Sequence, residues 1–181
     1  VVPALTMISG LGAFEKAVPS SLKTIAFGSE VFPARQLALW RKYVPNARYI
    51  NLYGPTEATG MSCYYVVDRE FKEDEVIPIG RPFPNTGILL LNEDGKEVTQ
   101  GEKGEICIRG TAVTMGYYRQ PEKTAGNFVQ NPLNKDYPEI IYKTGDLGYY
   151  NDRGELMFAS RKDYQIKHMG HVLNLVKLKA V

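Results

Sequence analysis

The sequence has no long hydrophobic run and no strong excess of charge of one sign. Its longest apolar segments, such as residues 88–91, are far shorter than the ~20 residues that span a bilayer. Lysine and arginine number 22 and the acidic residues 20, a net charge of +2. Such a balance does not indicate a nucleic acid or an anionic membrane as partner. The first residues show no signal-peptide pattern, so we expect a cytoplasmic protein that binds neither nucleic acid nor membrane.

Cysteine and histidine are also scarce. Cys63 and Cys107 are the only two cysteines, and their spacing matches no metal-binding motif. Two reduced and packed thiols suit a cytosolic protein, but the sequence leaves a disulfide between them open. His168 and His171 have no cysteine or further histidine nearby, which favours two surface histidines over a zinc site. The sequence therefore predicts no zinc centre.

What is present is the composition of a globular protein. The chain has 181 residues, of which 44% are hydrophobic and 23% are charged. This is enough to bury a core in one large domain or two small ones. Neither an internal repeat nor a low-complexity linker interrupts the sequence.

The first third has the pattern of a strand, a helix and a second strand. Residues 22–27 and 48–53 are short apolar runs, and each leads into a turn that contains glycine. Between them, Pro33 suits a first helical turn, and apolar residues recur at helical spacing over residues 37–44. A unit of about thirty residues suits a right-handed crossover between two parallel strands.

The two turns of this unit are the first candidate site. Ligands bind open parallel sheets outside the carboxyl ends of the strands, so we expect Gly28-Ser29-Glu30 and Tyr53-Gly54-Pro55-Thr56-Glu57 to face one pocket. The second turn offers an aromatic face on which adenine could stack, a hydroxyl for a phosphate and a carboxylate for magnesium. Taken alone, it could also be a plain turn whose threonine caps a helix.

From Pro78 onward the pattern changes to short strands and hairpins. Residues 92–95 and 151–154 combine Asp, Asn and Gly as tight turns do. Residues 120–123 have proline and an acid where a helix begins. Strand-like segments lie at residues 87–91, 105–109 and 155–159. We expect an antiparallel and barrel-like half.

Four segments in fixed order resemble the motifs of one family. They are Asn51-Leu52-Tyr53-Gly54-Pro55-Thr56-Glu57; Gly104-Glu105-Ile106-Cys107-Ile108-Arg109-Gly110 with Gly116-Tyr117; Tyr142-Lys143-Thr144-Gly145-Asp146-Leu147; and Arg161-Lys162-Asp163-Tyr164-Gln165-Ile166-Lys167. Together they resemble the acyl-adenylate-forming, AMP-binding enzymes. The resemblance is greatest to the amino-acid adenylation domains of nonribosomal peptide synthetases and to D-alanine-activating ligases. It covers about residues 25–170.

The resemblance implies an α/β fold in three parts. Residues 1–75 would form a partial parallel α/β layer with the nucleotide-binding turns, and residues 76–162 a β-rich, barrel-like subdomain. Residues 163–181 would form the hinge and a stub of a mobile C-terminal domain. Family members use ATP and Mg²⁺ to convert a small carboxylate, here an amino acid, to acyl-AMP and pyrophosphate. The acyl group then passes to the phosphopantetheine thiol of a carrier protein or, in an acyl-coenzyme A ligase, to coenzyme A.

The resemblance also assigns roles to single residues. Tyr53 would stack on adenine, Asp146 would accept hydrogen bonds from both ribose hydroxyls, and Arg161 would approach ribose and phosphate. Thr56 would bond a phosphate oxygen and Glu57 would hold magnesium, so these two would be catalytic. The ATP or AMP site would further include Gly28, Ser29, Glu30, Asn51, Gly54 and Phe158. The substrate side chain would contact Ile25, Phe27, Leu52, Gly60 and Met61, a mostly apolar set. Asp163 would be the hinge, with Lys167 just beyond it.

Simpler interpretations of several residues stay open at this point. Asp146 could be a turn or helix-capping acid, and Phe158 could pack in the core. Arg161, Asp163 and Lys167 could form an ordinary solvated charge cluster.

The sequence also departs from the family pattern. Ser160 stands where the family has glycine, and residues 172–181 lack the usual arginine and acidic run. The family's glycine-rich phosphate loop and its C-terminal catalytic lysine have no counterpart in these residues. Since such positive groups supply a large part of catalysis, we expect the isolated chain to be nearly inert. A non-catalytic nucleotide-binding module is the alternative.

Overall fold

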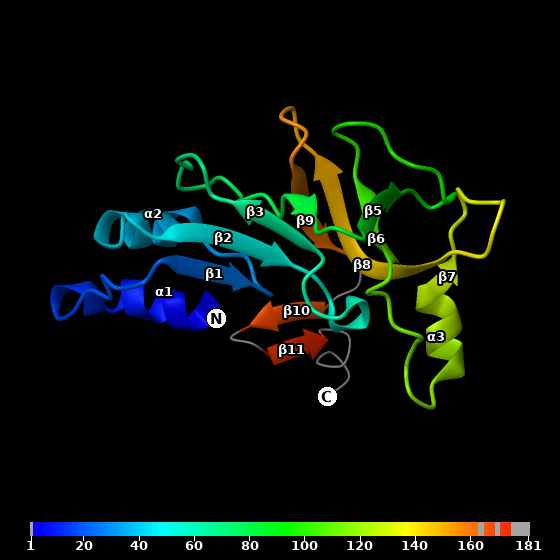
Figure 1. Cartoon of the computed structure of the whole chain (residues 1–181), viewed down its shortest axis with the longest axis horizontal. Coiled ribbons are helices and arrows are strands. Elements are labelled where there is room, and N and C mark those ends of the chain that lie inside the picture. Colours follow the sequence, from blue (N-terminus) through cyan, green and yellow to red (C-terminus); the bar gives the residue numbers. More distant parts are fainter. Residues whose placement is uncertain (1, 163–164, 169–170, 175–181) are drawn as a thin grey trace.

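The computed structural model describes residues 2–162, 165–168 and 171–174. In this part of the chain the helices are α1 (Val2–Gly10), α2 (Ala34–Tyr43) and α3 (Pro121–Asn127), with the 3-10 turns η1 (Ala13–Glu15) and η2 (Thr56–Ala58). The first sheet has the order β1 (Thr24–Gly28), β2 (Arg48–Tyr53), β3 (Cys63–Val66) and β4 (Arg81–Pro82). The second has the order β5 (Thr86–Leu91), β6 (Gly104–Gly110), β8 (Ile140–Tyr150) and β7 (Phe128–Gln130), and β9 (Leu156–Arg161) also pairs with β8. A short hairpin joins β10 (Gln165–His168) and β11 (His171–Asn174), as Figure 1 shows.

The predicted parallel unit is confirmed. Strands β1 and β2 are parallel neighbours, with Gly28 opposite Leu52, and α2 forms the crossover between them. Helix α2 follows Pro33 and buries the apolar side chains of Leu37 and Trp40 against the sheet. Because the strands are parallel, both glycine-containing turns lie at the same edge of the sheet.

The first sheet is not purely parallel. After the η2 turn the chain reverses, and β3 pairs antiparallel with β2, so that Tyr53 lies opposite Cys63. Strand β4 pairs antiparallel with β3. These two short strands were not predicted, because four and two residues carry too little pattern to be recognised.

The second sheet confirms the prediction of an antiparallel half. All of its strand pairs are antiparallel, and the long central strand β8 pairs with β6, β7 and β9. Register shifts interrupt the pairing of β8 with both β6 and β9; such bulges bend a strand. The predicted turns are also present: the amide of Gly95 bonds the carbonyl of Asn92, and that of Gly154 the carbonyl of Asn151.

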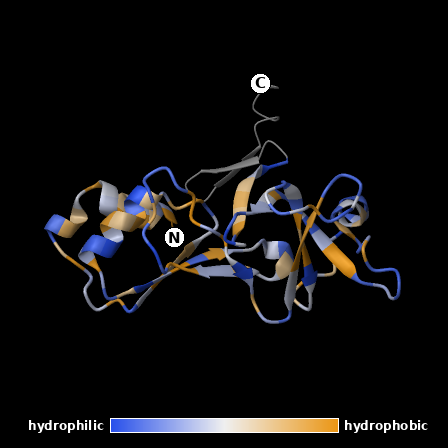
Figure 2. Ribbon diagram, turned by 90° about the horizontal axis from the view of Figure 1, so that it is seen from above, coloured by the Kyte–Doolittle hydropathy of each residue, from blue (hydrophilic) through white to orange (hydrophobic). Residues whose placement is uncertain are grey.

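Two of the three hydrophobic clusters in the described residues concern the site: one lies under the first sheet, and another links the two sheets. The first joins α1 and α2 to the sheet through Leu5, Phe27 and Trp40. The second contains Cys63 and Ile79 from the first half together with Leu90, Ile106 and Leu156 from the second sheet. Figure 2 shows hydrophobic segments along the strands of both sheets, whereas the peripheral loops are mostly hydrophilic. The predicted division at residues 75/76 and 162/163 stays a prediction.

Both cysteines are buried and free, so the disulfide left open by the sequence does not form. Burial raises the pKa of Cys63 and of Cys107 to about 12, and both thiols therefore stay protonated at neutral pH. Among the helices in the described part of the chain, none has the length and apolarity to cross a membrane.

Candidate functional site

The site begins at the two corners that follow β1 and β2. A Cβ at Gly28 would lie 2.2 Å from the carbonyl oxygen of Leu52, and one at Gly54 would lie 2.1 Å from that of Gly60. Both distances are too short for any side chain, so glycine is required by close backbone approach. Ser29 adopts a φ of 70°, a left-handed conformation that turns the chain sharply after β1.

Tyr53 and Asp146 meet across the two sheets, although 93 residues separate them. The hydroxyl of Tyr53, at the end of β2, donates a 2.6 Å hydrogen bond to Oδ2 of Asp146 in β8. Burial, and then the charge of Asp146, raise the pKa of Tyr53 well above its usual value of 10. The phenol therefore stays a neutral donor to the Asp146 side chain.

Arg161 holds the other oxygen of the same carboxylate. Its Nη1 lies 2.8 Å from Oδ1 of Asp146, and the two residues are opposite each other in the β8–β9 ladder. The backbone amide of Asp146 donates to Oγ1 of Thr144 at 3.0 Å. Asp146 lies within β8, so it caps no helix, and that interpretation was wrong. Each carboxylate oxygen has two lone pairs, so the group can accept further hydrogen bonds.

Glu57 forms a second carboxylate centre in the η2 turn. Oε1 of Glu57 accepts a 2.6 Å hydrogen bond from the hydroxyl of Tyr117, which lies 3.4 Å from the hydroxyl of Tyr142. The backbone carbonyl of Glu57 accepts from the amide of Thr114 at 2.9 Å. Thr56, beside it, is exposed. The structure thus ties the Thr56-Glu57 turn to the loop that follows β6.

Tyr117 and Tyr142 were not predicted as site residues. Both occur in the motifs that carry the resemblance, but 60 and 85 positions separate them from Glu57 and no local pattern links them to it. Burial, and then the bond to Glu57, raise the pKa of Tyr117. The pKa of Tyr142 is also raised, chiefly by burial. Both hydroxyls are therefore neutral donors at physiological pH.

Other predicted residues lie in or beside the core. Asn51 is buried, and its side-chain amide donates to the carbonyl of Pro78 at 2.8 Å. Phe158 is half-buried and packs against the second core cluster, and its place beside the ribose stays a prediction. Ile25 and Phe27 are buried in the first cluster. Leu52 and Glu30 are partly buried, whereas Ser29, Gly60 and Met61 are exposed.

The predicted hinge is only partly described. Asp163 lies outside the described residues, and the backbone of Lys167 lies in β10. Their roles stay predictions. The described residues also contain no group of three or more His, Cys, Asp or Glu that could hold a metal ion. A single carboxylate such as Glu57 can still hold a magnesium ion that arrives bound to phosphates. Mg²⁺ needs only one or two carboxylates when phosphates and waters complete its coordination shell.

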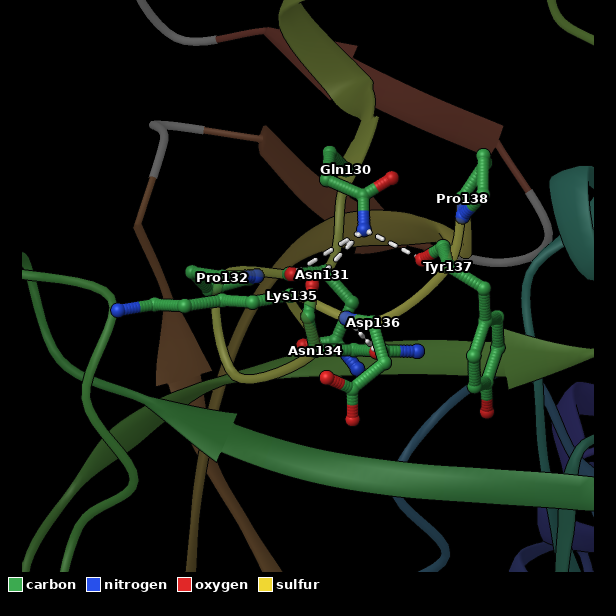
Figure 3. Close-up of a pocket in the computed structure, with 8 residues that line it drawn as sticks. All are labelled: Gln130, Asn131, Pro132, Asn134, Lys135, Asp136, Tyr137 and Pro138. Carbon is green, nitrogen blue, oxygen red and sulfur yellow. Dashed lines mark hydrogen bonds between the residues drawn. The ribbon is translucent and has the colours of Figure 1, made fainter.

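An open hollow of about 520 Å³ lies elsewhere, at the loop of residues 130–138. Figure 3 shows the amide nitrogen of Gln130 directed at the carbonyl groups of this loop; it donates to Asn134 at 3.1 Å and to Tyr137 at 3.3 Å. None of its lining residues is a predicted site residue. We therefore assign this hollow no function.

Comparison with known proteins agrees with the geometry. The family model described as "AMP-binding enzyme" matches residues 2–118. The chain is 36% identical over 161 residues to bacitracin synthase 1 of Bacillus licheniformis, covering 89% of this chain and 3% of that protein. It is 38% identical over 149 residues to a D-alanine--D-alanyl carrier protein ligase of Streptococcus pyogenes serotype M3, covering 82% of this chain and 28% of that ligase.

Solved structures give the same result. PA1221, a nonribosomal peptide synthetase protein with adenylation and PCP domains, superposes with a TM-score of 0.80 at 32% identity. The match covers 88% of this chain and 32% of that structure. The chain therefore spans about a third or less of each of these three relatives.

Proposed function

The chain belongs to the family of adenylate-forming, AMP-binding enzymes, and from this premise we propose that it supplies the nucleotide-binding part of an amino-acid-activating ligase. In the proposed reaction a carboxylate oxygen of the amino acid attacks the α-phosphorus of ATP, and the bond to pyrophosphate breaks. A carrier-protein thiolate then attacks the acyl carbonyl, and AMP leaves. The contact between Tyr53, Asp146 and Arg161 is the observation that carries the proposal.

Asp146 is proposed to bind the ribose. Its two oxygens are already held by a neutral phenol and a guanidinium, at 2.6 and 2.8 Å. A carboxylate has the acceptor geometry that suits the 2′ and 3′ hydroxyls of the sugar. Arg161 is proposed to approach the phosphate from the same side, because a guanidinium is a permanently charged donor that suits phosphate oxygens.

The two corners are proposed to hold the rest of the nucleotide. The ring of Tyr53 would stack on adenine while its hydroxyl stays bonded to Asp146. Gly28, Ser29, Glu30, Asn51 and Gly54 would line the adenosine side, and the exposed hydroxyl of Thr56 would bond a phosphate oxygen. Glu57 would hold magnesium, which when bound neutralises charge on the phosphates.

The amino-acid pocket and the acceptor are proposed from the composition of five residues and from the names of the relatives. Ile25, Phe27, Leu52, Gly60 and Met61 would surround the substrate side chain, and their composition favours an apolar one. One relative is named a D-alanyl carrier protein ligase, and the PA1221 structure contains a PCP domain. These names support a carrier-protein thiol as the acceptor, with coenzyme A as the alternative.

The first test is an ATP–pyrophosphate exchange assay on the whole protein that the gene encodes. We expect exchange that depends on an added amino acid. Dependence on a fatty or aryl acid instead would contradict the proposed substrate class and favour an acyl-coenzyme A ligase.

The second test is the variant Asp146→Asn, with ATP affinity measured by calorimetry. Losing a charged acceptor should weaken ATP binding by about tenfold or more. Asp152→Asn is the matched control, because Asp152 is an exposed acid in the turn of residues 151–154. Unchanged ATP affinity in Asp146→Asn would overturn the assignment of the ribose site.

A further inference from the structure

Glu105 is a buried carboxylate for which the proposed reaction has no direct use. It lies in β6, and its side chain is only 9% exposed. A buried carboxylate is unfavourable unless cations or hydrogen-bond donors compensate it. Its partners therefore indicate what it does.

Three donors surround Glu105. Its Oε1 accepts a 3.1 Å hydrogen bond from the backbone amide of Gly145. Its Oε2 lies 3.6 Å from Nζ of Lys143 and 3.5 Å from Nζ of Lys162. The Glu105 carboxylate thus links Lys143 and Gly145, which flank Thr144 in β8, to Lys162, which follows β9.

The segment that Glu105 holds carries Asp146. Gly145 has a left-handed φ of 72°, and its carbonyl accepts the amide of Lys162 at 2.7 Å. On its other side, the hydroxyl of Thr144 donates to the carbonyl of Ile106 at 2.7 Å. A register shift in the β6–β8 pairing falls between Glu105 and Cys107. The β6–β8 ladder is irregular at Glu105, and at this point the Glu105 side chain accepts a hydrogen bond from the backbone amide of Gly145.

We propose that Glu105 is a positioning residue: through the amide of Gly145 it fixes the Thr144–Asp146 segment, and so aims the Asp146 carboxylate at the ribose. This inference rests on the proposed function, since it assumes that Asp146 binds the sugar hydroxyls. Glu105 itself touches no substrate in the proposal and acts only through its neighbour along β8.

The experiment compares ATP with 2′,3′-dideoxy-ATP, which lacks both hydroxyls. Dissociation constants are measured by calorimetry for the whole protein that the gene encodes and for Glu105→Ala, Glu105→Gln and Glu139→Ala. The readout is the ratio of the two constants, which does not change if a variant is partly unfolded. Glu139 is the matched control: it is a partly buried carboxylate next to the same sheet, but it bonds Arg109 and Asn131, away from Asp146.

The wild-type protein should bind ATP about a hundredfold more tightly than the dideoxy nucleotide. Glu105→Ala should reduce this ratio about tenfold, mainly by weakening ATP binding. Glu105→Gln should keep the ratio within about threefold of wild type, because its amide oxygen can still accept from Gly145. Glu139→Ala should leave the ratio unchanged.

Two different results would overturn the proposal. A wild-type protein that binds both nucleotides equally would refute the ribose site itself, and with it this inference. A normal wild-type ratio that Glu105→Ala also retains would leave the ribose site intact and would reduce Glu105 to a stabiliser of the sheet. If Glu105→Gln reduces the ratio of the two dissociation constants as much as Glu105→Ala does, the hydrogen bond to Gly145 does not position Asp146.

Discussion

Two tyrosine hydroxyls donate to the two carboxylates of the site. Tyr53 bonds Asp146 and Tyr117 bonds Glu57, each at 2.6 Å. A phenol fixes a carboxylate in place but, unlike a lysine or arginine, does not neutralise it. Glu57 thus accepts a side-chain hydrogen bond from a phenol, whereas Asp146 is also paired with Arg161. This difference agrees with a metal role for Glu57 and a sugar role for Asp146.

Tyr117→Phe should weaken the binding of the magnesium ion that accompanies ATP. The ring of Tyr117 keeps its edge contact with Phe128 and its place under Lys123, so only the hydroxyl is lost. Glu57 is then less constrained, and we expect the magnesium concentration for half-maximal ATP binding to rise about fivefold. The measurement is a magnesium titration of ATP binding followed by calorimetry.

Tyr118→Phe is the control for this experiment. Tyr118 is the next residue, is 84% exposed and makes its ring contact with Arg119. It should show the magnesium dependence of the wild type. If Tyr117→Phe does the same, the hydroxyl does not orient Glu57 for a cation.

Single residues differed in how far the sequence could place them. Tyr53 and Asp146 stand in compact motifs, and the expectation that they meet agrees with their hydrogen bond. The bond between Tyr117 and Glu57 had no such signal, because it depends on how the loop after β6 packs against η2. Arg161 pairs with Asp146, which favours a site contact over an ordinary solvated charge.

At the scale of elements, regular patterns were predicted well and irregular ones were not. Strands β1 and β2 and helix α2 have clear apolar periodicity, and all three form where expected. Helix α1 is apolar on several sides, with Met7 and Ile8 exposed, so no helical periodicity marks it. Strand β8 was recognised by its motif rather than as a strand, because Gly145, with a φ of 72°, interrupts its pattern.

Gly54→Ala should damage the corner after β2. The new Cβ would lie 2.1 Å from the carbonyl oxygen of Gly60 and 2.5 Å from the amide of Ser62, which are backbone atoms that cannot turn aside. We expect a loss of about 3 kcal/mol in unfolding free energy and weaker ATP binding. Thermal unfolding and calorimetry measure the two effects.

Gly126→Ala is the matched control within a helix. Gly126 lies in α3, and a Cβ there meets no atom within 4 Å. Alanine should raise the stability by about 0.5–1 kcal/mol, because it favours the helix and limits the unfolded chain. A Gly54→Ala protein as stable as wild type would show that the corner is looser than the structure indicates.

At the scale of the whole molecule, the two sheets share a core and the site lies where they meet. The backbone amide of Ile79 bonds the carbonyl of Leu156 at 2.9 Å, and Thr59 bonds the carbonyl of Ala112 through its hydroxyl at 2.7 Å. These contacts join segments more than 50 residues apart. Periodicity predicts each element but not such contacts, so the arrangement of the sheets came from the family resemblance alone.

The core should make the protein sensitive to alkaline pH. Burial raises the pKa of Cys63, Cys107 and Tyr49 to about 12, and it also raises the pKa of Tyr65 and Tyr142. These groups ionise near pH 9 or 10 when the chain is unfolded, but only at higher pH when it is folded. Above pH 9 the unfolded state therefore binds fewer protons than the folded state, and stability falls as the pH rises.

Urea denaturation between pH 7 and 11 should show this directly. We expect these groups to leave the unfolding free energy nearly constant up to about pH 7.5, because almost all of them are protonated in both states there. The free energy should then fall by about 1.4 kcal/mol per pH unit for each group that ionises only on unfolding. Replacing Cys107 by alanine should make the decline shallower by one such group, because alanine carries no proton to release. A decline with the same slope in both proteins would mean that this thiol is not shielded in the folded state.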